Sequence, residues 1–222
     1  MASGLWPARE RLATAGRRLA DAGLVGGSAG NLSERVGELV AVTPTGAALQ
    51  ALTAEQVVVV DLSGEHVDGG LVATSELGLH LGIYRRYQAG AVVHTHGLVA
   101  TALSCVIDEL PVFHYQVLAL GGPVRVAPYA TFGSRELADA TVEALQDRSA
   151  ALMSNHGAVV HAPGLDLAVE RAVLLEWACA VYWHAATIGT PRTLDVEQQA
   201  AFLDAVAERR YGSLQRRLED DG

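Results

Sequence analysis

Two histidines stand two residues apart in His94-Thr95-His96, at the end of a run that begins with three apolar residues. The run predicts a strand over residues 91–96, and side chains at positions i and i+2 of a strand leave by the same face. Both imidazoles can therefore reach one ion, although a histidine pair on a strand is also compatible with simple packing. A third histidine, His156, lies at a predicted tight turn between two strands. Three histidines that leave one position of a zinc ion open are typical of a catalytic site.

The remaining histidines show no ligand spacing, and we interpret them as surface or hydrogen-bonded core residues: His66, His80, His114, His161 and His184. Glu76 and His80 are four residues apart in a predicted helix. This Glu-x-x-x-His spacing differs from the Glu-x-x-His of di-iron sites and from the His-Glu-x-x-His of zinc helices. The sequence therefore assigns no role to His80.

Three short loops of small residues offer hydroxyl groups, an amide or accessible backbone N–H groups: Gly30-Asn31, Thr45-Gly46 and Thr74-Ser75. Thr74-Ser75 also opens a predicted helix, where backbone amides point outward. Together the loops are able to hold a phosphate group without a lysine, and separately each is compatible with an ordinary turn or cap. The chain has neither a Gly-x-x-x-x-Gly-Lys-Ser/Thr loop nor a Gly-x-Gly-x-x-Gly element, which excludes nucleotide binding by those motifs.

The chain has 222 residues, of which 50% are hydrophobic and 18% charged, and this length predicts one domain over residues 1–222 with a sizeable core. The polar end, residues 212–222, is expected to be a flexible tail. The formal net charge of −9 repels polyanions, and no Lys/Arg stripe offsets it. Nucleic acid and anionic membranes are therefore not expected as partners.

Cys105 and Cys179 fall in apolar helical segments without a Cys-x-x-Cys spacing, and both are expected to be buried, reduced thiols. Residues 1–11 mix charged residues with proline and tryptophan, so we expect no signal peptide. No later apolar run has the composition of a membrane span. These observations predict a cytoplasmic protein.

Apolar residues at helical and strand spacings predict a mixed order of elements. Helices are expected over residues 8–22, 74–87, 135–147, 165–188 and 195–210, with a further helix through Cys105. Strands are expected over residues 39–42, 57–62, 91–96 and 124–128, and as a hairpin over 150–161. This order indicates an α/β fold, a three-layer αβα sandwich with a mixed, largely antiparallel central sheet. Helix 165–188 is too apolar for one solvated face, so it is expected in the centre or at a subunit contact.

A set of motifs, in order along the chain, resembles the class II aldolase/adducin family: Ser28-Ala29-Gly30-Asn31-Leu32-Ser33, Thr43-Pro44-Thr45-Gly46, Thr74-Ser75-Glu76, His94-Thr95-His96, His114-Tyr115, Ala127-Pro128-Tyr129-Ala130-Thr131-Phe132-Gly133 and Asn155-His156-Gly157. The resemblance extends from about residue 8 to Gly212. The histidine motifs are specific because they occur together with the Gly-Asn and Ser-Glu elements.

The resemblance implies one zinc ion per chain, with His94, His96, His156 and Glu76 as its ligands. Glu76 matches the family's acid/base glutamate, a role that requires a pKa raised toward neutrality. The phosphate group of the substrate is expected at Gly30, Asn31, Thr45, Gly46, Thr74 and Ser75. Thr74 replaces the serine that is usual in similar family members, and this change keeps the hydroxyl group.

The resemblance also assigns roles to three aromatic residues. Tyr115 and Tyr211 match tyrosines that protonate or hold the oxygen of an aldehyde fragment, and Phe132 matches a wall residue beside it. Each is also compatible with aromatic packing. The family arrangement implies a homotetramer with active sites at subunit contacts, in which both tyrosines approach from the neighbouring chain. Gly97 lacks a side chain directly after His96, which is expected to alter the aldehyde pocket.

The activity implied by the resemblance is that of a zinc-dependent aldolase. Its substrate would be a ketose 1-phosphate of the L-fuculose 1-phosphate type, cleaved reversibly to dihydroxyacetone phosphate and a small aldehyde such as L-lactaldehyde. The same family includes pentulose-5-phosphate 4-epimerases and methylthioribulose-1-phosphate dehydratases or aldolases, which remain alternatives. An adducin-like binding module is disfavoured, because such modules lose the metal histidines and this chain keeps all three.

Overall fold

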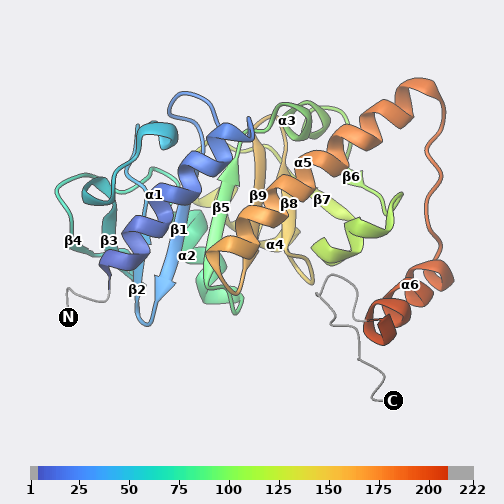
Figure 1. Ribbon diagram of the computed structural model, residues 1–222. Helices are drawn as coiled ribbons and strands as arrows, with labels where there is room; N and C mark the ends of the chain where they lie inside the picture. Colours follow the sequence, from blue (N-terminus) through green and yellow to red (C-terminus); the bar gives the residue numbers. More distant parts are fainter. Residues whose placement is uncertain (1–4, 210–222) are drawn as a thin grey trace, which may run out of the picture.

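The computed structural model describes residues 5–209, and its centre is a nine-stranded sheet in the order β4-β3-β2-β1-β5-β9-β8-β7-β6 (Figure 1). The strands are β1 Asn31–Val36, β2 Leu39–Val42, β3 Val58–Asp61, β4 His66–Asp68, β5 Ala91–Thr95, β6 Glu109–Leu110, β7 Val124–Ala127, β8 Ala150–Met153 and β9 Gly157–Ala162. Strands β7 and β8 run parallel. The other neighbouring pairs are antiparallel, which confirms the mixed, largely antiparallel sheet.

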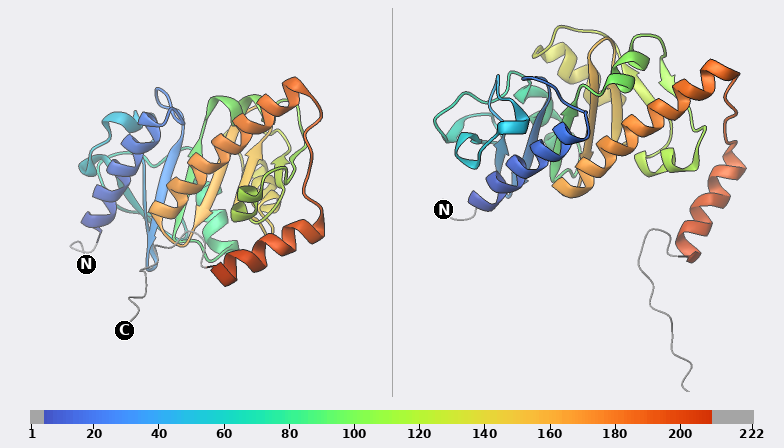
Figure 2. Two further views of the ribbon diagram at one scale, coloured as in Figure 1. Left: turned by 45° about the vertical axis from the view of Figure 1, so that its right-hand side comes forward. Right: turned by 45° about the horizontal axis from the view of Figure 1, so that its top comes forward.

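Helices cover both faces of the sheet (Figures 1 and 2). One layer holds α1 Trp6–Asp21, α3 Leu98–Ser104 and α5 Leu165–Ile188, and the other holds α2 Leu77–Arg86 and α4 Arg135–Ala144. The 3₁₀ helices are η2 Leu49–Ala51, η3 Ala54–Gln56 and η4 Tyr115–Leu120, and α6 Val196–Arg209 follows α5 after a connecting segment. The two layers enclose separate apolar cores, one on each face, so the predicted three-layer αβα sandwich is confirmed.

Strand β5 contributes side chains to both apolar cores. Val93 belongs to the core beneath α1 and α5, whereas Val92 belongs to the core beneath α2 and α4. His94 follows the alternation of a strand and therefore lies on the same face as Val92. Asn31 of β1 is paired with His94 of β5, so these two residues lie side by side on adjacent strands.

Most predicted elements are present, with ends that differ by at most three residues. Strand 39–42 and helix 165–188 have the predicted bounds. The helix predicted from Thr74 begins only at Leu77, with Glu76 at the N-cap position, and the helix predicted to residue 147 ends at Ala144. Strands β1, β4 and β6 and the three 3₁₀ helices were not predicted.

The prediction for Cys105 is wrong. Cys179 is buried in α5, and burial raises the pKa of its thiol above the ordinary value, but Cys105 is exposed. Cys105 is the C-cap residue of α3, and its exposed thiol donates to the Thr101 carbonyl at 3.3 Å.

Helix α5 packs one face on the sheet and leaves several large apolar side chains exposed. Leu175 and Ala178 are buried, whereas Val173, Trp177 and Trp183 are each at least 40% exposed. An apolar surface of this kind is typical of a contact with another protein surface. Among the described residues, no helix has both the length and the apolar character needed to cross a membrane.

Candidate active site

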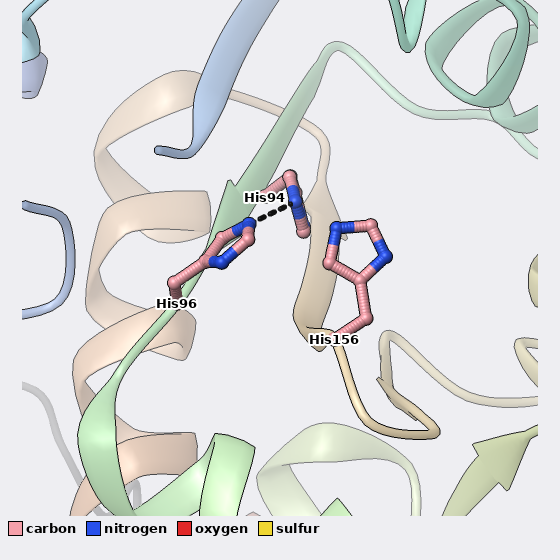
Figure 3. Close-up of side chains that lie close together, drawn as sticks. All are labelled: His94, His96 and His156. Atoms are coloured by element: carbon pink, nitrogen blue, oxygen red, sulfur yellow. Dashed lines mark hydrogen bonds between the residues drawn. The ribbon is translucent and has the colours of Figure 1, made fainter. Parts of the chain in front are cut away.

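The imidazole rings of His94, His96 and His156 converge at one end of the sheet (Figure 3). His94 is in β5, His96 follows that strand, and His156 lies in the turn from β8 to β9. The Nε2 atoms of His94 and His96 are 2.9 Å apart, and the three rings each offer a nitrogen within 4.8 Å of the others. The antiparallel pairing of β5 with β9 brings these distant parts of the sequence together.

The Asn-His-Gly turn depends on close backbone approach. A Cβ atom at Gly157 would lie 2.4 Å from the Thr95 carbonyl oxygen, so only glycine fits between β9 and β5 at this point. Asn155 adopts a positive φ of 55°, a conformation that asparagine tolerates better than most residues. This turn fixes the position of His156 opposite the two histidines of β5.

The local environment favours the neutral, metal-binding form of His96 and His156 and fixes the orientation of the His94 ring. Nδ1 of His94 is 2.9 Å from the Ala158 carbonyl oxygen and donates to it, so Nε2 is the nitrogen that faces His96 and Glu76. Burial, with the nearby charges of His94 and His156, lowers the pKa of His96 to about 4. Burial, together with the charge of His94, also lowers the pKa of His156.

The carboxyl group of Glu76 completes the cluster from the start of α2. Its Oε2 is 3.1 Å from His94 Nε2, and its Oε1 is 3.6 Å from His156 Nε2. Within residues 5–209, Oε1 is buried and has no hydrogen-bond partner. A buried carboxylate oxygen left without a donor beside three imidazole nitrogens fits the donor set of a divalent metal ion, since a cation would satisfy it.

The pKa of Glu76 does not follow the sequence-based expectation. Burial by itself raises this pKa, but the hydrogen bond and charge of His94 lower it, as do the hydrogen bond from Asn31 and the charge of His156. The result is a pKa well below the ordinary value, not one raised toward neutrality. In this arrangement Glu76 is a carboxylate held by its neighbours.

A cavity of about 460 Å³ opens beside the histidine cluster and is lined by Glu76, His96 and His156. All the residues predicted to bind phosphate line the same cavity: Gly30, Asn31, Thr45, Gly46, Thr74 and Ser75. Phe132 lines it as well, with 69% of its surface exposed. Several further residues line the cavity without a predicted site role, namely Ser28, Ala29, Pro44, Tyr129, Ala130 and Asn155.

The two threonine loops of the cavity are held together by their backbones. The Thr45 N–H donates to the Val72 carbonyl, and the Thr74 N–H donates to the Thr43 carbonyl. Because these N–H groups are occupied, contacts from Thr45 and Thr74 to an anion must come from their hydroxyl groups. Within residues 5–209, no lysine or arginine lines the cavity, so neutral donors are the groups that these residues offer to an anion there.

Tyr115 does not line the cavity of its own chain. It begins η4, where its ring lies 4.3 Å from the ring of His114 and 4.8 Å from that of Phe202 in α6, measured between centroids. Tyr211 lies outside the described residues.

Gly97 leaves room for the side chain of Glu176. A Cβ atom there would lie 2.3 Å from Oε2 of Glu176, whose carboxylate accepts from the N–H groups of Val99 and Ala100. Gly97 does not line the cavity, and its missing side chain gives Glu176 room to cap the start of α3. An effect of Gly97 on the aldehyde pocket stays a prediction.

His80, to which the sequence assigned no role, is completely buried beneath the site. Its Nε2 is 2.5 Å from Oδ1 of Asn31, and the Asn31 amide donates to Glu76 at 2.9 Å. The available signal was spacing: Glu76, His80 and Tyr84 follow one another at intervals of four residues, on one side of a helix.

Comparisons with known proteins agree with this geometry. Residues 10–183 match the family described as "Class II Aldolase and Adducin N-terminal domain". The 5-deoxy-D-ribulose 1-phosphate aldolase of Bacillus thuringiensis serovar kurstaki is 36% identical over 193 residues, which cover 86% of this chain and 91% of the relative. The L-fuculose phosphate aldolase of Escherichia coli strain K12 is 37% identical over 183 residues, covering 82% and 85%. A solved L-fuculose 1-phosphate aldolase superposes with a TM-score of 0.87 at 32% identity, covering 90% of this chain and 96% of that one.

Proposed function

We propose that this chain, a class II aldolase that belongs to the class II aldolase/adducin family, cleaves a ketose 1-phosphate to dihydroxyacetone phosphate and a small aldehyde. The observation that carries the proposal is that the histidine cluster, Glu76 and the hydroxyl-bearing loops adjoin the same cavity. A phosphate group at Thr45, Thr74 and Ser75 would place the carbonyl end of a short sugar beside the histidines.

The metal of this proposal is zinc, about one ion per chain, held by His94, His96, His156 and Glu76. When bound, zinc supplies a Lewis acid that polarises the substrate carbonyl. The nitrogen-rich donor set supports zinc over magnesium or calcium, which prefer oxygen ligands.

Glu76 is the proposed acid/base residue. In the cleavage direction it delivers a proton to the carbon of dihydroxyacetone phosphate that loses the aldehyde, and in the reverse direction it removes that proton. The pKa of Glu76 is low while His94 and Asn31 hold its carboxylate. Once the Glu76 carboxylate moves away from the histidine cluster, the influences that lower its pKa are reduced, and burial raises the pKa toward the range that proton transfer requires.

The aldehyde fragment is the less constrained part of the substrate. Relatives are named for L-fuculose phosphate, 5-deoxyribulose 1-phosphate and 5-methylthioribulose 1-phosphate, which share a phosphorylated ketose end. Tyr129 and Phe132 stand exposed at the cavity, so an aldehyde with an apolar end, such as L-lactaldehyde, suits its wall. Sugar phosphates are metabolites of the cytoplasm, where we propose that the enzyme acts.

A coupled assay tests this function directly. The zinc-loaded protein is incubated with each of the three ketose 1-phosphates, and dihydroxyacetone phosphate is followed through a reductase that oxidises NADH. We expect cleavage of at least one substrate with equimolar trapped aldehyde, since an aldolase must release both fragments. Interconversion of ribulose 5-phosphate and xylulose 5-phosphate without free aldehyde would instead establish the epimerase alternative. A protein inert toward all these sugars would favour a binding module.

We also propose a homotetramer in which Tyr115 and Tyr211 of one chain complete the cavity of the next. Two observations support it. The apolar residues exposed on α5 provide a contact surface, and Tyr115 lies outside the cavity of its own chain. Cyclic assemblies repeat one contact between neighbouring chains, so each cavity would receive one set of tyrosines.

Coexpression of two defective chains tests this shared site. Tyr115→Phe is expected to lower kcat about tenfold, the value of one hydrogen bond, and Glu76→Gln to lower it further. In randomly mixed tetramers, about a quarter of sites would combine an intact Glu76 with an intact Tyr115 from the next chain. We therefore expect the mixed protein to reach about a quarter of the wild-type rate. A rate equal to the average of the two separate variants would show that Tyr115 does not act across chains.

A further inference from the structure

A buried line of hydrogen bonds extends from Glu76 into the protein, away from the cavity. The Asn31 amide nitrogen donates to Glu76 Oε2 at 2.9 Å, and Asn31 Oδ1 is 2.5 Å from His80 Nε2. His80 Nδ1 is 2.6 Å from the Ser33 hydroxyl, which is 2.8 Å from the Tyr84 hydroxyl. Asn31, Ser33, His80 and Tyr84 are each at most 6% exposed.

The chemistry of these groups gives the line one direction. A carboxylate can only accept, so the NH₂ group of Asn31 must face Glu76 and its carbonyl oxygen must face His80. His80 therefore carries its proton on Nε2, and its Nδ1 must accept from the Ser33 hydroxyl. The Ser33 oxygen is then free to accept from Tyr84. Each hydrogen bond of the line then joins one donor to one acceptor, and reversing any one bond leaves a buried group unpaired.

Burial keeps both titratable groups inside this line neutral. Burial is the main cause that lowers the pKa of His80 to about 3. The negative charge of Glu76 opposes this lowering. Burial likewise raises the pKa of Tyr84 above its ordinary value. At physiological pH, His80 thus stays a neutral imidazole with one donor and one acceptor.

The backbone fixes the two sides of the line independently. Asn31 and Ser33 are two residues apart in β1 and share one face of that strand, while His80 and Tyr84 are four residues apart in α2 and share one side of that helix. Glu76 is the N-cap residue of the same helix. As a result, Oε2 of Glu76 is held by Asn31, and the unpartnered Oε1 is the oxygen turned toward His156.

We propose that His80 is a positioning residue for the aldolase reaction, which holds the Asn31 amide in the orientation that donates to Glu76 and thereby keeps Oε1 of Glu76 directed at the metal cluster and cavity. This inference rests on the proposed acid/base role of Glu76. His80 touches neither the cavity nor the cluster, and it acts only through Asn31.

Two substitutions of His80 separate positioning from packing. In His80→Asn the amide reaches about as far as Nδ1, so it keeps the Ser33 contact and loses the donor to Asn31. In His80→Gln the amide nitrogen reaches about as far as Nε2, so it can restore that donor. We expect His80→Asn to lower kcat about 10-fold to 100-fold, the usual effect of losing a supporting hydrogen bond at a metal site, with the Michaelis constant little changed. His80→Gln should recover most of this loss.

The matched control is His161→Asn. His161 is a half-buried histidine of β9 that stacks on Tyr87 and bonds to the Arg148 carbonyl, outside the cavity. The His161→Asn variant should lose thermal stability without loss of kcat. Wild-type kcat in His80→Asn at full metal occupancy would overturn the proposal. So would a loss of kcat that excess zinc restores, or an equal loss of kcat in His161→Asn.

The tautomer of His80 gives a readout that does not depend on activity. Nitrogen NMR of the ¹⁵N-histidine-labelled wild-type protein should show His80 as the neutral Nε2–H tautomer, and Ser33→Ala should release that preference. An Nδ1–H tautomer in the wild-type protein would overturn the proposal even if the protein cleaves ketose phosphates. The expected tautomer in a protein without aldolase activity would instead show that the function, and not the hydrogen-bond line, was assigned wrongly. If His80→Asn does not fold, Ser33→Ala serves in its place, with an expected loss in kcat of about tenfold.

Discussion

Replacing His156 with alanine is expected to remove most of the bound zinc and to lower kcat roughly 10³-fold, because a Lewis-acid metal contributes several kcal/mol of transition-state stabilisation. His156 supplies the nitrogen that faces the unpartnered oxygen of Glu76, 3.6 Å from Oε1. Without it, the cluster retains two imidazoles and one carboxylate, and the three-histidine arrangement of a catalytic zinc site is lost. Elemental analysis measures metal per chain, and the coupled assay measures kcat in the same preparation.

The matched control for this substitution is His184→Ala. His184 is exposed on α5 and lies outside the cavity, so its variant should equal the wild type in both measurements. A chelator should reduce the wild-type rate to that of His156→Ala, and added zinc should restore only the wild type. Full metal content and full rate in His156→Ala would remove this residue from the site.

The histidine cluster could be predicted because its geometry is local. The i, i+2 spacing on β5 places His94 and His96 on one face, and the Asn-His-Gly turn has a sequence pattern of its own. The apolar runs around these motifs predicted β5, β8 and β9 to within one residue at most ends. What spacing could not show was that β9 lies beside β5, since that pairing depends on the whole sheet.

Strand β1 was not predicted because its pattern violates the rule that strands bury apolar residues. Asn31 and Ser33 point into the protein, where an alternating strand would carry apolar side chains. They are polar because they bond to Glu76, His80 and Tyr84. Sequence reasoning thus failed at a functional feature, where local rules are most often broken.

The start of α2 was placed too early for a related reason. Thr74 and Ser75 have the composition of helix caps, but the Thr74 backbone pairs with Thr43 and its hydroxyl accepts from the Glu76 N–H at 3.3 Å. These residues form a wall of the cavity, and the helix begins after Glu76. Cap preferences cannot distinguish a residue that ends a loop from one that lines a ligand cavity.

Substituting glutamine for Glu76 is expected to leave the metal in place but to lower kcat at least ~10²-fold, the usual size of a positioned acid/base contribution. Glutamine has the same shape, and its amide oxygen can still accept the Asn31 hydrogen bond now made at 2.9 Å. The three imidazoles remain to hold zinc. What the variant loses is the ability to take up and deliver a proton.

Two rates report on this loss of proton transfer. Cleavage of the ketose 1-phosphate and exchange of a carbon-bound proton of dihydroxyacetone phosphate both require proton transfer, so both should fall together in Glu76→Gln. The control is Glu34→Gln, which also replaces a glutamate with glutamine. Glu34 lies in β1, and its carboxylate pairs with Arg11 outside the cavity. Near wild-type rates of both reactions in Glu76→Gln would reduce Glu76 to a metal ligand or a residue that starts α2.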